Sequence, residues 1–130
     1  MFYFNENGIM VTGWNELSWS WGINMFYFNE DGATVTGWNK LKWSGGIDMF
    51  YFDEDGAIVT GWNELKWSGG IDWFYFDDED GHMLTGWQTL TWSRGTDTFY
   101  FMPDSGIQVT DTCININNKK YCFDEDGCLI

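Results

Sequence analysis

A sequence block of 24 residues recurs along the chain and limits the fold more than any other feature. Copies fill residues 1–24, 25–48, 49–72 and 73–97, and a divergent C-terminal section fills residues 98–130. A block this short cannot bury a core alone, so neighbouring copies must stack to share one. The repeat therefore predicts a single domain over residues 1–130, built as a linear array of about five units.

Each copy has the pattern of two short β-strands joined by a tight turn. In the third copy, the β-prone runs 61–67 and 73–76 flank Gly69-Gly70, which is a hairpin signal. A glycine recurs at the second turn position in every full copy, as a turn with positive φ requires. No helical periodicity is present, and a lone hairpin is unstable in water. The predicted fold class is therefore all-β, a β-solenoid of stacked β-hairpins.

The turn predicts which side chains share a face of the hairpin. With Ser68 opposite Ile71, strand alternation separates the side chains into two sets. The predicted core face carries Leu65, Trp67, Phe74 and Phe76. The second face, predicted to be half solvated, carries Trp62, Glu64, Lys66, Trp73 and Tyr75. The equivalents of Trp67 in the other copies, which are Trp19, Trp43 and Trp92, are expected on core faces too.

An acidic turn such as Asp53–Gly56 follows each predicted second strand. Its glycine suits the left-handed position of a tight turn. Carboxylates are the ligands that Ca²⁺ prefers, but the spacing here matches no calcium motif. We therefore expect these acids to shape the turn, and we predict no metal site and no cofactor.

Three cysteines lie near the C-terminus. Asn117-Asn118 has the composition of a two-residue turn, which places Cys113 opposite Cys122 in a non-hydrogen-bonded pair. A cross-strand disulfide is expected there in an oxidising compartment. Cys128 is then left over and available for pairing between chains, and zinc binding by the three thiols is the less favoured alternative.

Composition excludes several classes of function. The formal net charge of -14 opposes binding to nucleic acid or anionic membranes, which need basic side chains. No apolar run is long enough for a membrane span. No nucleophile is paired with a base and no phosphate loop is present, so we expect no enzyme. Aromatic residues, at 21% with 10 Trp, instead indicate a platform for sugars or quaternary amines.

The repeat resembles a known family. Thr-Gly-Trp, a hairpin turn, aromatic-aromatic-Tyr-Phe and then Asp/Asn-x-x-Gly is similar to the choline-binding or cell-wall-binding repeats of Gram-positive bacteria and their phages. The related glucan-binding and clostridial toxin repeats share this pattern, and residues 119–127 are the closest local match. The resemblance implies a left-handed solenoid with ligand sites between neighbouring hairpins, where an aromatic cage holds the trimethylammonium of choline on teichoic acids.

The resemblance also implies which residues form each cage: the Trp of Gly-Trp, the first residue of the second strand, and a Tyr of the following hairpin. The candidate cages are Trp14/Met25/Tyr51, Trp38/Met49/Tyr75, Trp62/Trp73/Tyr100 and Trp87/Thr98/Tyr121. Met or Thr replaces the middle aromatic in three of them, and the repeat is longer than is usual for the family. The cage at Trp62, Trp73 and Tyr100 is therefore the principal candidate.

Three hypotheses for function follow. The first is a non-catalytic, secreted or cell-surface module of bacterial or phage origin that binds choline-bearing teichoic acid or a related wall polymer. The second is a structural protein that forms homo-oligomers by end-to-end stacking, because residues 1–4 resemble a second strand without its first and residues 129–130 stop short of the next Gly-Trp. The third is binding of a glucan or another cell-surface glycan, since indole and phenol faces also stack on sugar rings.

Overall fold

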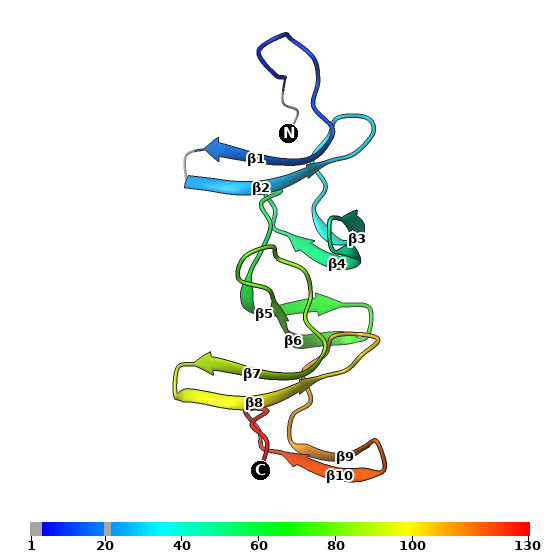
Figure 1. The fold of residues 1–130 in the computed structure, drawn as a ribbon, viewed down its shortest axis with the longest axis vertical. Helices are drawn as coiled ribbons and strands as arrows, with labels where there is room; N and C mark the ends of the chain where they lie inside the picture. The colour runs from blue at the N-terminus through cyan, green and yellow to red at the C-terminus, as the bar shows by residue number, and fades with distance from the viewer. Residues whose placement is uncertain (1–3, 20–21) are drawn as a thin grey trace. The chain divides into compact units, whose positions relative to one another are not determined.

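The computed structural model describes residues 4–19 and 22–130 and shows an all-β chain (Figure 1). The strands are β1 (Gly13–Trp19), β2 (Gly22–Phe28), β3 (Gly37–Trp43), β4 (Gly46–Phe52), β5 (Gly61–Trp67), β6 (Gly70–Phe76), β7 (Gly86–Trp92), β8 (Gly95–Phe101), β9 (Thr112–Ile116) and β10 (Lys119–Phe123). In the described part of the chain, consecutive strands pair into five two-stranded hairpins, which confirms the predicted fold class. Among the described residues, no helix has the length and apolar character needed to cross a membrane.

Two compact units make up the chain. The first contains the residues up to Gly61 together with Asp78–His82, and the second contains Trp62–Asp77 and Met83–Ile130. Within each unit, successive hairpins pack on one another as the repeat requires. The grouping of residues 1–130 into one repeat domain stays a prediction. The strand expected at residues 1–4 falls mainly outside the described residues, as does the side chain of Trp19.

The hairpin turn lies one residue earlier than the sequence predicted. Strand β5 ends at Trp67 and β6 begins at Gly70, so the two-residue loop is Ser68-Gly69. In the equivalent hairpins, the Trp that ends the first strand lies opposite the Gly that begins the second. The expected pairing of Ser68 with Ile71 is therefore wrong, although Gly70 does have the predicted positive φ, at 140°. The glycine begins the strand instead of completing the turn. The strand pairing thereby shifts by two residues, and a shift by an even number leaves every side chain on its predicted face.

The connector after each hairpin folds back onto the hairpin that it leaves. After β4, the Oδ1 of Asp53 accepts hydrogen bonds from the backbone N–H groups of Asp55 and Ala57, at 2.9 and 3.0 Å. Gly56, with φ of 87°, lies so close to Thr34 that a Cβ there would come within 3.1 Å of the threonine Cβ. The acid and the glycine of this turn are therefore used in shaping the backbone, as expected.

Phenylalanines of the second strands form the centre of each repeat. Phe74 and Phe76 of β6 are 1% and 0% exposed, which confirms their place on the core face. The second face is half solvated, as predicted: Trp73 is 43% exposed, whereas Tyr75 is only 8% exposed. It packs in one cluster with Phe99 and Phe101 of the next hairpin. The following hairpin therefore covers Tyr75 but leaves Trp73 of the same face exposed.

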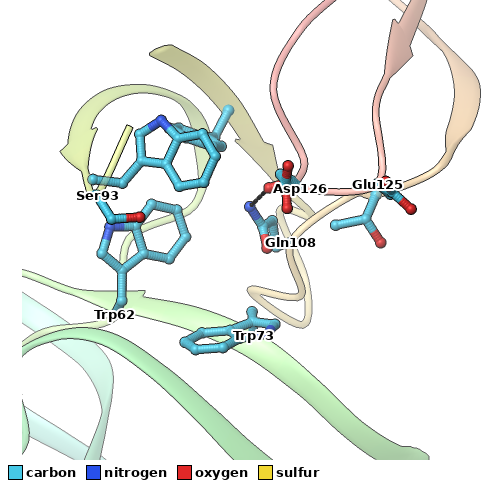
Figure 2. A pocket seen from close by; sticks show the side chains of 9 residues that line it. Trp62, Trp73, Ser93, Gln108, Glu125 and Asp126 are labelled. Atoms are coloured by element: carbon cyan, nitrogen blue, oxygen red, sulfur yellow. Dashed lines mark hydrogen bonds between the residues drawn. The ribbon is translucent and has the colours of Figure 1, made fainter. Parts of the chain in front are cut away.

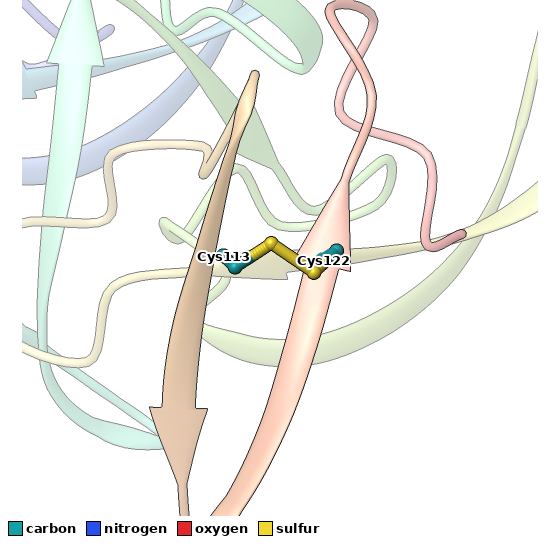
Figure 3. Close-up of a disulfide and its surroundings, with 2 residues drawn as sticks. All are labelled: Cys113 and Cys122. Carbon is teal, nitrogen blue, oxygen red and sulfur yellow. A yellow bond between two sulfur atoms is a disulfide. The ribbon is translucent and has the colours of Figure 1, made fainter.

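The last hairpin, β9-β10, is closed by an asparagine turn and a disulfide (Figure 3). Asn117 and Asn118 both have positive φ, and Cys122 lies directly opposite Cys113, which confirms the predicted turn and register. The two sulfur atoms are bonded, and the Cα atoms are 4.0 Å apart. Cys128 is a free, buried thiol.

Replacing Phe76 with Ala should lower the free energy of unfolding by about 3–5 kcal/mol, because a fully buried ring leaves a cavity. Replacing Ile71 with Ala on the same strand is the matched control. Its side chain is 65% exposed, so we expect a change within about 0.5 kcal/mol. Urea unfolding of both variants provides the measurement. Similar losses for the two variants would contradict the assignment of the core face.

Candidate functional site

A cavity of about 480 Å³ in the second unit brings three tryptophans together (Figure 2). Its lining residues come from β5, β6, the β7-β8 hairpin and the connectors after β8 and β10. They are Trp62, Trp73, Trp92, Ser93, Phe99, Gln108, Thr110, Glu125 and Asp126. The cavity is therefore aromatic on the hairpin side and polar on the connector side.

Trp62 forms the inner wall of the cavity and is held by rings of the next hairpin. Its indole lies 5.0 Å from Phe99 and 5.8 Å from Phe101, centroid to centroid. Within its own hairpin it meets the ring of Tyr75 edge-on at 5.2 Å. Among the described residues, the buried Nε1 of Trp62 has no hydrogen-bond partner, so ring packing alone fixes this indole.

The same contact recurs between other neighbouring hairpins of a unit. Trp14 lies 4.8 Å from Phe50 in the first unit, and Trp87 lies 4.9 Å from Tyr121 in the second. In each case the Trp of Gly-Trp packs nearly edge-on against the first inner aromatic residue of the following hairpin. We call this contact the interhairpin ring pair.

Trp73 provides an open aromatic face. It stands 6.4 Å from Trp62 at an interplanar angle of 75° and remains 43% exposed. Its backbone carbonyl accepts a hydrogen bond of 3.0 Å from the N–H of Gln108. The connector after β8 therefore fixes the strand that carries Trp73, while the indole itself stays available.

Trp92, expected only on a core face, is a wall of the cavity. The structure places it at the end of β7, where its Nε1 donates to Asp97 Oδ2 at 2.7 Å. The same indole-to-carboxylate bond joins Trp43 to Asp48. An aspartate five residues after this Trp was the sequence signal that the indole is held at the hairpin tip and is only half-buried.

The connectors supply the polar wall. Gln108 is 7% exposed, and its Nε2 donates to the backbone carbonyl of Asp126 at 3.1 Å. That bond, drawn in Figure 2, positions the Glu125-Asp126 segment beside the indoles. Both carboxylates are exposed. Indole faces with nearby carboxylates favour an organic cation over an anion.

Tyr100, the predicted third wall of this cage, lies elsewhere. It is not among the residues that line the cavity, and its ring lies 4.9 Å from Trp87 of its own hairpin. Phe99 contributes the ring that the following hairpin brings to Trp62. The cause is strand alternation, which points neighbouring residues of β8 to opposite faces.

Strand alternation also turns the tyrosine of the first candidate cage toward its own hairpin. Phe50 meets Trp14, whereas Tyr51 lies 5.1 Å from Trp38 of its own hairpin. Met25 of this cage is half-buried, and its backbone carbonyl accepts a hydrogen bond from Ile58 N at 3.0 Å. The ring that the following hairpin brings to Trp14 is therefore Phe50 and not Tyr51.

Of the two remaining candidate cages, one has its predicted Trp–Tyr contact and the other stays a prediction. Tyr121 does reach Trp87, because it lies two residues before Phe123, as Phe99 lies two residues before Phe101 in the preceding hairpin. Thr98 of this cage is half-buried. Trp38 and Met49 belong to the first unit and Tyr75 to the second, so the combination Trp38/Met49/Tyr75 stays a prediction.

His82 covers a tryptophan in the first unit. Its imidazole stacks on Trp43 at 5.1 Å and 27°, and its Nδ1 contacts Asp80. Because His82 occupies one face of Trp43, this indole is less available to a ligand than Trp73.

Comparison with known proteins identifies relatives by structure. No family model and no curated protein matches the sequence. Choline binding protein F from Streptococcus pneumoniae matches with a TM-score of 0.55 and 25% identity, over 99% of this chain and 48% of its own. The chain has the fold of the choline-binding repeat proteins. The resemblance expected from the Gly-Trp and Asp-x-x-Gly motifs is thus confirmed in structure.

Two further solved structures agree with this assignment of the fold. The modular autolysin LytC from Streptococcus pneumoniae, in complex with a synthetic peptidoglycan ligand, has a TM-score of 0.67 and 21% identity, over 99% of this chain and 27% of its own. A pneumococcal cell wall endolysin from phage Cp-1, complexed with choline, has a TM-score of 0.52 and 24% identity, over 100% of this chain and 36% of its own. This chain spans about half or less of the length of these proteins.

Cys128 packs beneath the cavity in the cluster that contains Phe99. Burial, with the carboxylates of Asp124 and Asp97, raises the pKa of its thiol from 9.0 to about 11. In the unfolded chain the thiol ionises near pH 9, whereas in the folded chain it stays protonated to about pH 11. The contribution of this thiol to stability is therefore complete below pH 9 and is lost as the pH rises through 11.

Between pH 9 and pH 11, the melting temperature of the wild type should fall further than that of Cys128→Ala. The variant lacks the thiol whose ionisation favours unfolding, while all other groups titrate alike in both proteins. Thermal unfolding followed by circular dichroism at the two pH values measures the difference. Parallel decreases would show that burial does not perturb this thiol.

Proposed function

We propose that this chain is a non-catalytic binding module that attaches to a cell surface through quaternary ammonium groups, of which choline is the principal candidate. The cavity formed by Trp62, Trp73 and Trp92 is the proposed binding site. One observation carries this proposal: three indoles and two carboxylates line the same cavity. A module of this kind acts outside the cell that produces it, so we propose a secreted or cell-surface location.

The chemistry of a quaternary ammonium group suits these walls. Such a cation has no N–H to donate, so it is held by π-faces and by exclusion of water, with about 0.5–2 kcal/mol for each face. Trp73 supplies an open face, Trp92 is oriented by Asp97, and Trp62 closes the inner side. Glu125 and Asp126 add electrostatic attraction without making a covalent or metal bond.

The relatives support a wall polymer as the larger ligand. The endolysin from phage Cp-1 is complexed with choline, and the autolysin LytC is in complex with a peptidoglycan ligand. By analogy, choline-bearing teichoic acid is the proposed partner of this chain. Weak sites in successive repeats would then reinforce one another on a single polymer through effective concentration.

A cell-surface glycan is the second candidate ligand. Ser93, Gln108 and Thr110 place hydroxyl and amide groups beside the indoles, which is the arrangement that a sugar ring needs for stacking and hydrogen bonding. The carboxylates distinguish the two candidates, since a neutral sugar gains nothing from their charge. Assembly into homo-oligomers stays a prediction from the sequence.

Replacing Trp73 with Ala should weaken choline binding about tenfold, because one π-face of the cage is lost. The indole is 43% exposed, so the melting temperature should change little. Isothermal titration with choline measures the affinity, and Ile71→Ala on the same strand is the control outside the cavity. Unchanged affinity in the Trp73 variant would rule out this cavity as the choline site.

The double variant Glu125→Gln, Asp126→Asn should weaken choline binding about threefold or more at low salt, and the difference should shrink as salt screens the charges. Binding of a neutral glucan oligosaccharide should not respond to this change. Parallel titrations with the two ligands separate the candidates. Glucan binding without choline binding in the wild type would favour the glycan function instead.

A further inference from the structure

A positively charged side chain lies at the rim of the cavity. Arg94 follows Ser93 in the β7-β8 turn, and its Cζ stands 5.9 Å from the ring centroid of Trp92. Its Nη1 lies 3.6 Å from Asp126 Oδ2. Trp92 and Asp126 both line the cavity, so the guanidinium already contacts an aromatic face and a carboxylate that an incoming cation would use.

The equivalent turn positions in two other hairpins carry no such group. Gly45 occupies this position after β3, and Gly69 occupies it after β5. A Cβ at Gly45 or Gly69 would overlap the indole of the preceding Trp, which folds over the loop. An internal cation at this turn position is therefore a feature of the β7-β8 hairpin and of the cavity beside it.

We propose that Arg94 is an internal competitor that lowers the affinity of this cavity for cationic ligands. The inference rests on the proposed function, because it concerns the regulation of the same site. The side chain of Arg94 is 75% exposed, and exposed ion pairs and cation–π contacts are weak. Arg94 therefore reduces the fraction of empty, binding-competent cavities without closing the site, and the apparent dissociation constant rises in proportion.

Such competition selects for ligands that bind at several points. A single free ammonium ion must displace the guanidinium unaided. A polymer bound elsewhere on the repeats presents its next ammonium group at a high effective concentration. Arg94 would thus reduce occupancy by free choline more than occupancy by a choline-bearing polymer.

Arg94→Gln tests this directly, with Lys120→Gln as the matched control. Lys120 is an exposed cation of β10 in the same unit and is not a lining residue of the cavity. Each variant makes the net charge one unit more negative, so the general attraction of cations rises equally in both. Isothermal titration with choline chloride should give about threefold tighter binding for Arg94→Gln, and little change for Lys120→Gln.

The outcomes separate this inference from the proposed function. Choline binding by the wild type with equal affinity in Arg94→Gln would overturn the competition and leave the function standing. Weaker binding in Arg94→Gln would also overturn it, because the guanidinium would then be part of the ligand site. Absence of choline binding in both proteins would contradict the proposed function and this inference with it.

Discussion

The interhairpin ring pair is the interaction on which the rest of the structure depends. A two-stranded hairpin is only marginally stable in water, so each repeat needs a neighbour to cover its aromatic residues. Trp62 meets Phe99 and Trp14 meets Phe50, at 5.0 and 4.8 Å. Edge-to-face pairs of this kind contribute about 0.5–1.5 kcal/mol beyond the area that they bury, and they align one hairpin on the next.

The candidate site is a consequence of this packing. Because the ring pair holds Trp62 against the next hairpin, its indole lines one cavity together with Trp73 of its own hairpin and Trp92 of the following one. Separate polar contacts then fix those two walls, through Gln108 for the strand of Trp73 and Asp97 for the indole of Trp92. The connectors that turn the chain back also bring carboxylates to the open side, so one repeat geometry provides both the aromatic and the acidic parts of the cavity.

Local rules made a large part of the fold predictable from the sequence. Strand alternation placed Phe74 and Phe76 on the core face, and the Asn117-Asn118 turn placed Cys113 opposite Cys122. One feature of the site was also expected: Trp62 and Trp73 were predicted to lie together, and they do share the cavity. The core face and the disulfide needed only the period of a strand and the chemistry of a turn, whereas the pairing of Trp62 with Trp73 came from the resemblance to choline-binding repeats.

The remaining features depend on how hairpins stack, which no single repeat encodes. Tyr100 was expected beside Trp62, but the stacking brings Phe99 there and turns Tyr100 toward Trp87. Trp92 was assigned to a core face alone. The sequence of one repeat does not show that the neighbouring hairpin leaves an open space next to this indole. The position of the glycine at the turn was also missed, since a shift of two residues in register leaves the same faces and the same hydrophobic pattern.

A crystal structure of the chain grown with choline would show whether ring-paired hairpins create a cavity for an ammonium group. We expect electron density for the trimethylammonium group between Trp62, Trp73 and Trp92, with Trp62 still packed on Phe99. Electron density for choline at another place would contradict this binding site. So would a structure in which the three indoles pack together and leave no cavity.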